Sequence, residues 1–527
     1  MNVKKLVCSI ISLSLLVNCG IAALPVSASA VDTDTEIYVS PDGNDSNSGS
    51  SESPFKTLER AKAEVRVHNS NMSGNIIVNI ASGVYYMDNT LEFTQADSGT
   101  NGFSVIYRGI TDENGNSPIV SGGVDISDNW ELYDESLNIY KHENIDWSFR
   151  QLYTNNDRAI RARVPNLENK ETGGPYFRAS GGDGSYPLFI GTNNEYAQKA
   201  GNDAEIIWNS SWSQFRARIE SYNSSTGRVT FKAPDNSFAW NHHTQGDTPF
   251  YLENSLAYLD SEGEWYLDKD TSTLYYKPRE GEIMNKTEII APKLETIIDI
   301  NGIDENKTEN ITFDGIQFLH SNWLAPDSYG YCSVQGGFRY QSEGGKDNSA
   351  IRGSARYDAP KSMVQLRHTK NISLINSEFS FSGSWGIMGY EDTENTFIDH
   401  NVFTKNAGGG VTMGMAGREW DDQTENEQPR TYTDMDGQSR YDTITNNYID
   451  HVACEYQDMV GIGAMLPQHM TIANNEIGYL PYTGINIGWN WLDTDHGMTA
   501  NKVYQNYIHN TCMLLQDGGG IYSLGRM

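Results

Sequence analysis

Short apolar runs bounded by Gly, Asn and Asp dominate the last third of the chain and recur with a regular spacing. A glycine followed by Ile or Val appears five times, at intervals of 24, 51, 23 and 36 residues: Gly386, Gly410, Gly461, Gly484 and Gly520. A triplet of the type Asn-x-[Ile/Phe] precedes four of these glycines, beginning at Asn401, Asn447, Asn475 and Asn506. Helical periodicity is nearly absent. A basic period of 23 to 24 residues, with extra residues in two intervals, indicates a short multi-strand coil that carries loop insertions.

A parallel β-helix accounts for this repeat. Each coil would supply two or three strands, which pair with the equivalent strands of the coils above and below. Asparagines stacked at inward turns would hydrogen-bond one another and the backbone, so the four repeat asparagines are predicted to be structural. The predicted fold class is therefore all-β.

Two intervals exceed the basic repeat, and each excess predicts a loop. The first predicted loop is the polar stretch 416–441, which contains Arg418, Glu419, Trp420, Asp421 and Asp422. The second predicted loop lies between Trp489 and Lys502. Both leave the coil after a Gly-[Ile/Val] strand, so both are expected to overhang the same face. Long loops over one face of a solenoid are where binding clefts are usually built.

The N-terminal region predicts a cap. Leu58, Ala61 and Val65 form the apolar stripe of a short helix, which would cover strand edges that an open first coil exposes. Strands of the first coils are expected at 76–80, 103–107 and 119–120. The stretch 42–47 has oxygen ligands enough for calcium, but turn formation is the simpler interpretation, and no metal or cofactor is assigned.

Between about residues 125 and 291 the pattern changes to long hairpins. The stretch 150–153 turns at Asn155-Asn156 into 158–163, and 264–267 turns into 273–276. These antiparallel pairs predict a β-sandwich inserted into the β-helix, which resumes near 310–313. The expected organisation is a leader at 1–30, cap and first coils at 31–124, the insertion at 125–292 and the main β-helix at 293–527.

Residues 1–30 have the pattern of a secretory signal peptide. Lys4 and Lys5 precede an apolar run from Leu6 to Val17, and Ala28-Ser29-Ala30 offers a cleavage site. No later stretch approaches the ~18 apolar residues that a membrane span requires. The mature protein is therefore expected to be secreted, without a membrane span.

Composition narrows the function. With 38 Lys and Arg against 69 Asp and Glu, the formal charge is −31, which excludes a sequence-independent nucleic-acid binder. A hydrophobic content of 38% can build a large core and excludes a disordered acidic segment. Removal of the leader leaves Cys332, Cys454 and Cys512, which are too few for a disulfide framework and are expected to be buried free thiols.

Asp458 and Asp517 are the candidate catalytic residues. Each stands three residues before a repeat glycine, and Pro481 occupies this position in the coil between them. If the repeats stack in phase, the two carboxylates share one face, about 9.6 Å apart at a strand spacing of about 4.8 Å. Inverting glycosidases separate their carboxyl groups by roughly 6.5–9.5 Å and retaining ones by about 5–5.5 Å, so the spacing slightly favours inversion. The alternative is that both residues only form turns.

Aromatic residues flank these positions: Tyr482, Trp489, Trp491 and Tyr522. Sugar rings stack on such side chains, so these four are predicted to bind substrate. The two tryptophans alternate across a strand, and only one of them is expected to face the cleft.

Further carboxylates are reserve candidates for the acid or the base. Asp493, Asp495 and His496 belong to the second loop and could close over a substrate, Asp495 being counted among the substrate-binding residues. Glu476 stands at the outward position of its triplet, in line with Tyr448 and Tyr507, where a solvated surface residue is the more common finding.

Several separated motifs resemble glycoside hydrolase family 141: residues 150–153 with 158–163, 263–268 with 274–278, 480–485 with 488–489, and 517–522. The resemblance implies a right-handed parallel β-helix with an inserted β-sandwich, as in the related family 120 β-xylosidases. It also implies a secreted enzyme acting on plant cell-wall polysaccharide, either xylan or fucosylated pectin. Acidic residues in the β-helix cleft carry catalysis in such families; Asp517 matches first and Asp458 second, and which of them is the acid stays open.

Two other functions are compatible with a β-helix. A polysaccharide lyase would need a calcium cluster and a Lys or Arg base near a polyanion, and the acidic charge disfavours that substrate. A noncatalytic carbohydrate-binding or adhesion solenoid would bind sugars without releasing product. Because 517–525 is the middle of a coil, the chain is also expected to continue past residue 527 into further coils and an anchoring module.

Overall fold

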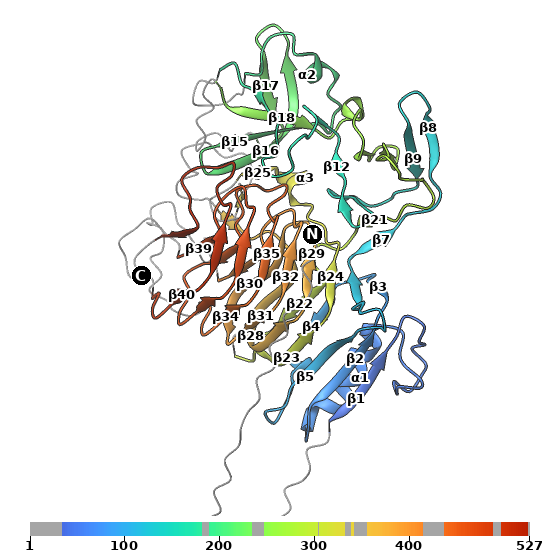
Figure 1. Ribbon diagram of the computed structural model, residues 1–527, viewed down its shortest axis with the longest axis vertical. Helices are drawn as coiled ribbons and strands as arrows, with labels where there is room; N and C mark the ends of the chain where they lie inside the picture. The colour runs from blue at the N-terminus through green and yellow to red at the C-terminus, as the bar shows by residue number, and fades with distance from the viewer. Residues whose placement is uncertain are drawn as a thin grey trace, which may run out of the picture.

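The computed structural model describes residues 34–181, 189–233, 235, 247–303, 305–332, 339–341, 356–414, 437–488 and 497–524. Two long parallel sheets form a β-helix in the lower part of Figure 1, and antiparallel strands lie above it. This arrangement confirms the predicted all-β parallel β-helix with an inserted antiparallel domain. The predicted leader lies outside the described residues. Among the described residues, no helix has the length and apolar character to cross a membrane.

The larger sheet of the β-helix runs through ten strands in order: β1 (Thr35–Val39), β2 (Ile76–Ala81), β5 (Val105–Ile110), β23 (Thr308–Asp314), β28 (Ser362–Ile375), β30 (Trp385–Glu394), β33 (Val411–Met413), β36 (Ile462–Ala464), β39 (Ile485–Ile487) and β42 (Ile521–Ser523). Its side branches are β4 (Leu91–Phe93), β22 (Ile298–Asn301), β31 (Phe397–Asp399), β34 (Thr443–Thr445), β37 (Thr471–Ala473) and β40 (Lys502–Tyr504). The first strand after the insertion is β22, which pairs in parallel with β4 and β28.

The smaller parallel sheet contains one strand from each coil: β3 (Val84–Tyr86), β6 (Ile119–Ser121), β24 (Gln317–Leu319), β29 (Glu378–Ser380), β32 (Val402–Thr404), β35 (Tyr448–Asp450), β38 (Glu476–Gly478) and β41 (Tyr507–His509). Helix α1 (Leu58–His68) follows β1 and buries Leu58, Ala61 and Val65, which confirms the predicted apolar stripe. The carboxylate of Asp45 accepts hydrogen bonds from the backbone of Lys56 and Thr57, so it fixes the turn ahead of α1.

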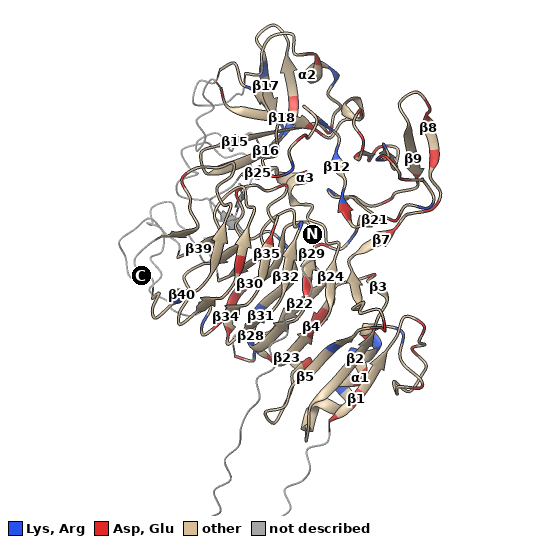
Figure 2. Cartoon of the chain, viewed as in Figure 1, with Lys and Arg blue, Asp and Glu red and all other residues tan. Residues whose placement is uncertain are grey.

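The inserted domain consists of three sheets. The largest holds β13 (Arg163–Val164), β18 (Pro249–Glu253), β15 (Glu205–Ser210), β16 (Ser213–Asn223), β17 (Arg228–Phe231), β14 (Phe177–Arg178) and β25 (Tyr331–Cys332). The second holds β12 (Ile160–Arg161), β19 (Glu264–Asp268), β20 (Thr273–Tyr276), β9 (Ile139–Glu143) and β8 (Glu131–Asp134), and the third β11 (Asp157–Arg158), β10 (Tyr153–Thr154), β21 (Ile289–Pro292) and β7 (Gly123–Asp125). Helices α2 (Glu195–Lys199) and α3 (Ala325–Tyr329) are short. Acidic and basic residues lie together near β12 and β18 (Figure 2).

Both predicted hairpins are present. Strands β19 and β20 pair antiparallel over their whole length, and β10 pairs with β11 through a turn in which Asn155 and Asn156 have φ angles of 49° and 58°. Asparagine tolerates this left-handed region better than most residues. The β10–β11 hairpin is shorter than predicted, because the next strand, β12, pairs in parallel with β19 instead of continuing the hairpin.

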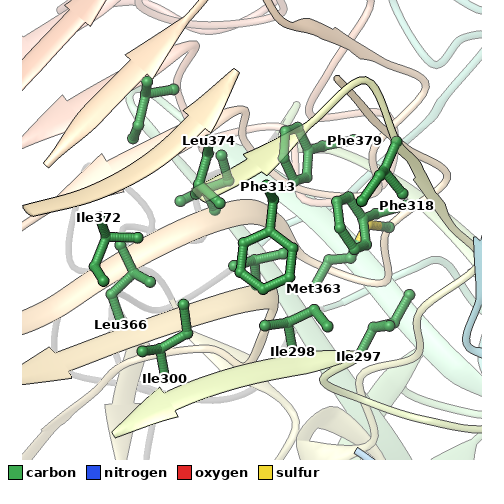
Figure 3. Packing of buried hydrophobic residues seen from close by; sticks show 14 of the residues in the cluster. Ile297, Ile298, Ile300, Phe313, Phe318, Met363, Leu366, Ile372, Leu374 and Phe379 are labelled. Carbon is green, nitrogen blue, oxygen red and sulfur yellow. The ribbon is translucent and has the colours of Figure 1, made fainter. Parts of the chain in front are cut away.

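Aliphatic and aromatic side chains fill the β-helix interior (Figure 3). Phe318, Phe379 and Phe403 occupy equivalent positions of successive coils, and their rings stack at centroid distances of 5.2 and 5.3 Å. The repeat therefore places like residues above one another, as a solenoid core requires.

The repeat asparagines form the predicted ladder. The backbone N–H and the side-chain amide of Asn401 both donate to Oδ1 of Asn447, each at 3.0 Å. Asn447 donates in the same way to Asn475, and Asn475 to Asn506. Each of the three donors is thus satisfied by the coil that follows, which confirms their structural role.

The repeat glycines stack because the coils approach closely there. A Cβ atom on Gly410 would lie 2.7 Å from the carbonyl oxygen of Gly461, one on Gly461 would lie 2.8 Å from that of Gly484, and one on Gly484 2.7 Å from that of Gly520. Real Cβ atoms do not come this near to backbone, so a side chain at these positions would force the coils apart.

Cys332, Cys454 and Cys512, all within the described residues, form no disulfide. Cys332 is buried as expected, whereas the expectation is wrong for Cys454, which is exposed, and for Cys512, which is only half-buried. Cys454 is exposed because it stands in the turn after β35, where its thiol donates to the carbonyl oxygen of His451. Burial raises the pKa of the Cys332 thiol well above its ordinary value.

Asp442 occupies a buried turn where its oxygens accept hydrogen bonds from the backbone N–H of Thr396 and the hydroxyl of Thr393, each at 2.7 Å. Burial raises the pKa of this carboxyl to about 6 from an ordinary value of 3.8. Because the folded state holds the proton more tightly than the unfolded state, this group stabilises the fold below pH 4 and loses that contribution as the pH rises through 6.

Asp442→Asn is therefore expected to stabilise the protein at neutral pH. The amide keeps the bond from Thr396 and donates to the Thr393 hydroxyl, whose hydrogen is then available to Ser439. The free energy of unfolding of the variant minus that of the wild type should be larger at pH 7 than at pH 4, by on the order of 2–3 kcal/mol. Urea unfolding at both pH values measures this difference, and an unchanged difference would contradict it.

Candidate active site

The coil turns before β36 and β42 are structurally equivalent. In one, the N–H groups of Glu455 and Tyr456 both donate to the carbonyl oxygen of Ala407. In the other, those of Leu514 and Leu515 both donate to the carbonyl oxygen of Pro481. Each turn then continues through a Gln-Asp pair to its repeat glycine.

Strand register places the two aspartates in phase. Ile462 of β36 pairs with Ile485 of β39, which pairs with Ile521 of β42. Asp458 and Asp517 each stand four residues before their isoleucine, so they precede strands that lie two apart in the sheet. Their backbones differ, because only Asp517 of the two has a positive φ angle. Two strand spacings correspond to about 9.6 Å along the sheet.

Asp458 is completely buried, and Tyr331 contacts its carboxylate. The hydroxyl of Tyr331 donates to it, at 2.9 and 3.0 Å from the two oxygens. Tyr331 belongs to β25, which pairs with β16 of the inserted domain in the register Tyr331 with Arg216. The inserted domain therefore positions the side chain that orients Asp458.

Asp517 has a different environment. It is exposed, and its backbone is in the left-handed region with a φ of 56°, which an aspartate tolerates. The hydroxyl of Tyr482 donates to its carbonyl oxygen at 2.9 Å. Tyr482 is buried with its hydroxyl engaged, so in this arrangement it supports the Asp517 turn instead of presenting a face for sugar stacking.

An aromatic cluster surrounds the Asp458 turn. The ring of Tyr456 lies edge-on to those of Trp323 and Tyr331, at centroid distances of 4.7 and 5.0 Å. Trp385 and Tyr482 belong to the same buried cluster. Such edge-to-face pairs add to the stabilisation from burial and fix the side chains around the carboxylate.

The inserted domain also holds this turn from outside. Arg158 contacts the carboxylate of Glu455 at 2.6 Å, and Asn209 and Gln214 donate to the side-chain oxygen of Gln457 at 3.0 and 2.9 Å. Burial opposes ionisation of Glu455, but the guanidinium groups of Arg158 and Arg216 outweigh it and hold the pKa of this carboxyl below its ordinary value. The segment that carries Asp458 is therefore anchored on both sides.

A row of side chains runs across the outward face of the larger sheet beside these turns. Ile485 and Ile487 point into the core, so Asn486 between them points away from it. The register continues the row through Met388, Thr412, Gly463, Asn486 and Tyr522. Tyr522, one of the predicted substrate-binding residues, is half-buried at the end of this row.

The remaining predicted residues separate into two groups. Glu476 and its neighbours Tyr448 and Tyr507 are exposed on the smaller sheet, away from the strands that follow Asp458 and Asp517. Trp489, Trp491, Asp493, Asp495 and His496 lie outside the described residues, as do residues 415–436 of the first predicted loop.

Sequence reasoning missed Tyr331, Thr412 and Asn486. Tyr331 is 127 residues from Asp458 in the chain, and only the inserted domain brings them together. A signal did exist for the other two: Thr412 and Asn486 are polar residues between apolar ones in Val411-Thr412-Met413 and Ile485-Asn486-Ile487.

Comparison with known proteins agrees with this architecture. A family model described as the GH141 insertion domain matches residues 137–279, which lie within the antiparallel domain. A solved structure described as a glycoside hydrolase is similar with a TM-score of 0.79 and 24% sequence identity, over 93% of this chain and 86% of that chain. The sequence matches none of the curated proteins with which it was compared.

Two more distant solved structures also align. The complex of XylC with xylose has a TM-score of 0.42 and 11% identity over 94% of this chain and 67% of that chain. A GH136 lacto-N-biosidase from Eubacterium ramulus has a TM-score of 0.27 and 11% identity over 90% of this chain and 68% of that chain.

The antiparallel domain is thus a GH141 insertion domain, carried on a β-helix of the kind found in a solved glycoside hydrolase. The predicted resemblance to family 141 is confirmed for the inserted domain, and the likeness to the solved glycoside hydrolase confirms the predicted fold.

Proposed function

We propose that this protein hydrolyses glycosidic bonds with Asp458 and Asp517 as its pair of acidic residues. The observation that supports the proposal is the matching start of the two Gln-Asp turns, each of which leads into a strand, the two strands being two coils apart. Most glycosidases use two carboxyl groups, one as general acid and the other as base or nucleophile.

The two environments fit a division of roles. Asp458 is buried among aromatic rings and oriented by Tyr331, whereas Asp517 is exposed on its turn. Two carboxyl groups in unlike surroundings are the usual means of separating an acid from a base. A backbone spacing of about 9.6 Å leaves room for a water molecule between substrate and base, as inversion requires.

The proposed substrate is plant cell-wall polysaccharide, either xylan or a fucosylated pectic glycan, and the proposed location is extracellular. The GH141 insertion domain supports the carbohydrate substrate, and the Lys4-Lys5 leader pattern supports secretion. The net charge of −31 argues against a strongly anionic polysaccharide as substrate.

The test is a product profile from xylan, pectins and aryl glycosides, with Asp517→Asn beside the wild type. The variant is expected to lose roughly 10²-fold or more of kcat, because it removes one member of the acid–base pair. Asp270→Asn, which changes an exposed carboxylate in the β19–β20 turn, is the matched control and should keep full activity. Unsaturated products that absorb in the ultraviolet would instead show a lyase and would reject the proposal.

A further inference from the structure

Within the part of the chain that the structure describes, Asn486 is a buried amide without a hydrogen-bond partner. Only 1% of the residue is exposed, and neither Oδ1 nor Nδ2 is hydrogen-bonded. The contrast with the structural asparagines is direct, since Asn447 and Asn475 satisfy their amides within the ladder. A buried amide left unpaired destabilises a fold, so such groups call for an explanation.

Its neighbours on the outward face share this property. Thr412, also buried, has a hydroxyl without a partner. Gly463 stands between Thr412 and Asn486 in register, and a Cβ atom there would come within 2.8 Å of the Thr412 hydroxyl oxygen. The glycine therefore makes room for the Thr412 side chain, and the backbones of the two polar residues lie two strand spacings, ~9.6 Å, apart.

Gly463 lies on the coil that carries Asp458. Gly463 follows Asp458 by five residues, and Tyr522 of the Asp517 coil pairs with Asn486. The row thus connects the two coils of the proposed catalytic pair. An amide that both donates and accepts, in one row with a hydroxyl two strands away, matches hydroxyl groups at separate positions of a sugar ring.

We propose that Asn486, together with Thr412, is a substrate-binding subsite that hydrogen-bonds the hydroxyl groups of a pyranose ring. This assignment rests on the proposed function and names the residues that hold the sugar. The unpaired amide is then a cost to the fold that the bound sugar offsets.

The test separates binding from folding. Asn486→Leu removes the unpaired amide at nearly constant volume, so the melting temperature should stay the same or rise while kcat/KM falls by about tenfold or more. Thr412→Val, which replaces one hydroxyl by a methyl group, should lower kcat/KM less and also keep the melting temperature. Asn447→Ala is the matched control: it removes a ladder amide, should lower the melting temperature, and should leave kcat/KM of the folded enzyme unchanged.

Binding keeps the test independent of catalysis. Calorimetry with xylohexaose and with a fucosylated oligosaccharide should show weaker binding by Asn486→Leu than by wild type, even if the wild type hydrolyses neither. If the wild type hydrolyses neither probe but still binds them more tightly than Asn486→Leu does, the proposed function is rejected and the subsite is retained. The subsite is overturned if Asn486→Leu lowers the melting temperature as Asn447→Ala does with kcat/KM unchanged, or if the wild type binds neither probe.

Discussion

Replacing Asp458 by Asn is expected to lower kcat by roughly 10²- to 10⁴-fold, the range that general acid–base catalysis contributes. The amide cannot transfer the proton that glycosidic cleavage requires. It can still accept the hydrogen bond from Tyr331 through Oδ1, so the fold should persist. Reducing-end release from the best substrate of the panel measures the loss, and thermal unfolding checks that the variant is folded.

The pH dependence distinguishes catalysis from support. If Asp458 is the acid or the base, Asp458→Asn removes one limb of the bell-shaped profile of kcat/KM, whereas a merely structural role would leave both limbs in place. Tyr331→Phe should shift that limb without removing it, because the phenol contacts the carboxylate and does not carry the reaction. A variant with both limbs intact and kcat close to wild type would show that Asp458 only forms its turn.

Local repetition explains why much of the fold could be predicted from the sequence. Asn447 bonds its counterparts one coil away, and Gly461 needs its small size because the next coil lies against it. Both constraints recur in every coil, so they leave a periodic trace in the sequence. The phase of Asp458 and Asp517 follows from the same periodicity, since strand register fixes it.

The contacts that complete the site leave no such trace. Arg158 reaches Glu455 over a separation of 297 residues, and Tyr331 reaches Asp458 only because β25 joins the largest sheet of the inserted domain. These pairs depend on how the inserted domain packs against the β-helix, which composition and spacing do not encode. Burial of Tyr482 was missed for a related reason: an aromatic residue beside a repeat glycine can face either a cleft or the adjoining coil.

The docking of the inserted domain therefore matters to the site, and a buried ion network holds that domain together. Arg150 forms a bidentate pair with Glu205 at 2.8 and 2.7 Å and also contacts Asp327 of α3. Arg161 lies 3.1 Å from both Glu205 and Glu253. Burial opposes ionisation of Glu205, but Arg150 and Arg161 outweigh it and hold the pKa of this carboxyl well below its ordinary value of 4.5.

Arg150→Met is consequently expected to lower the free energy of unfolding by about 3–5 kcal/mol, because it leaves buried carboxylates without their main partner. Lys199→Met, which breaks the exposed pair with Glu195, is the control and should cost less than about 0.5 kcal/mol. Denaturant unfolding monitored by tryptophan fluorescence measures the free energy of unfolding of both variants, and kcat is measured separately for each.

Two further measurements decide whether the loss of stability in Arg150→Met comes from a buried carboxylate left without its partner. The double variant Arg150→Met with Glu205→Met should recover much of the stability, because replacing a buried pair by apolar residues costs far less than breaking it. The penalty of Arg150→Met should also shrink as the pH falls below about 4.5: a depressed pKa stabilises the fold above that value, and the contribution is lost on protonation. A penalty that is equal at pH 7 and pH 4, or a double variant weaker than the single one, would mean that Arg150 acts through packing and not through its charge.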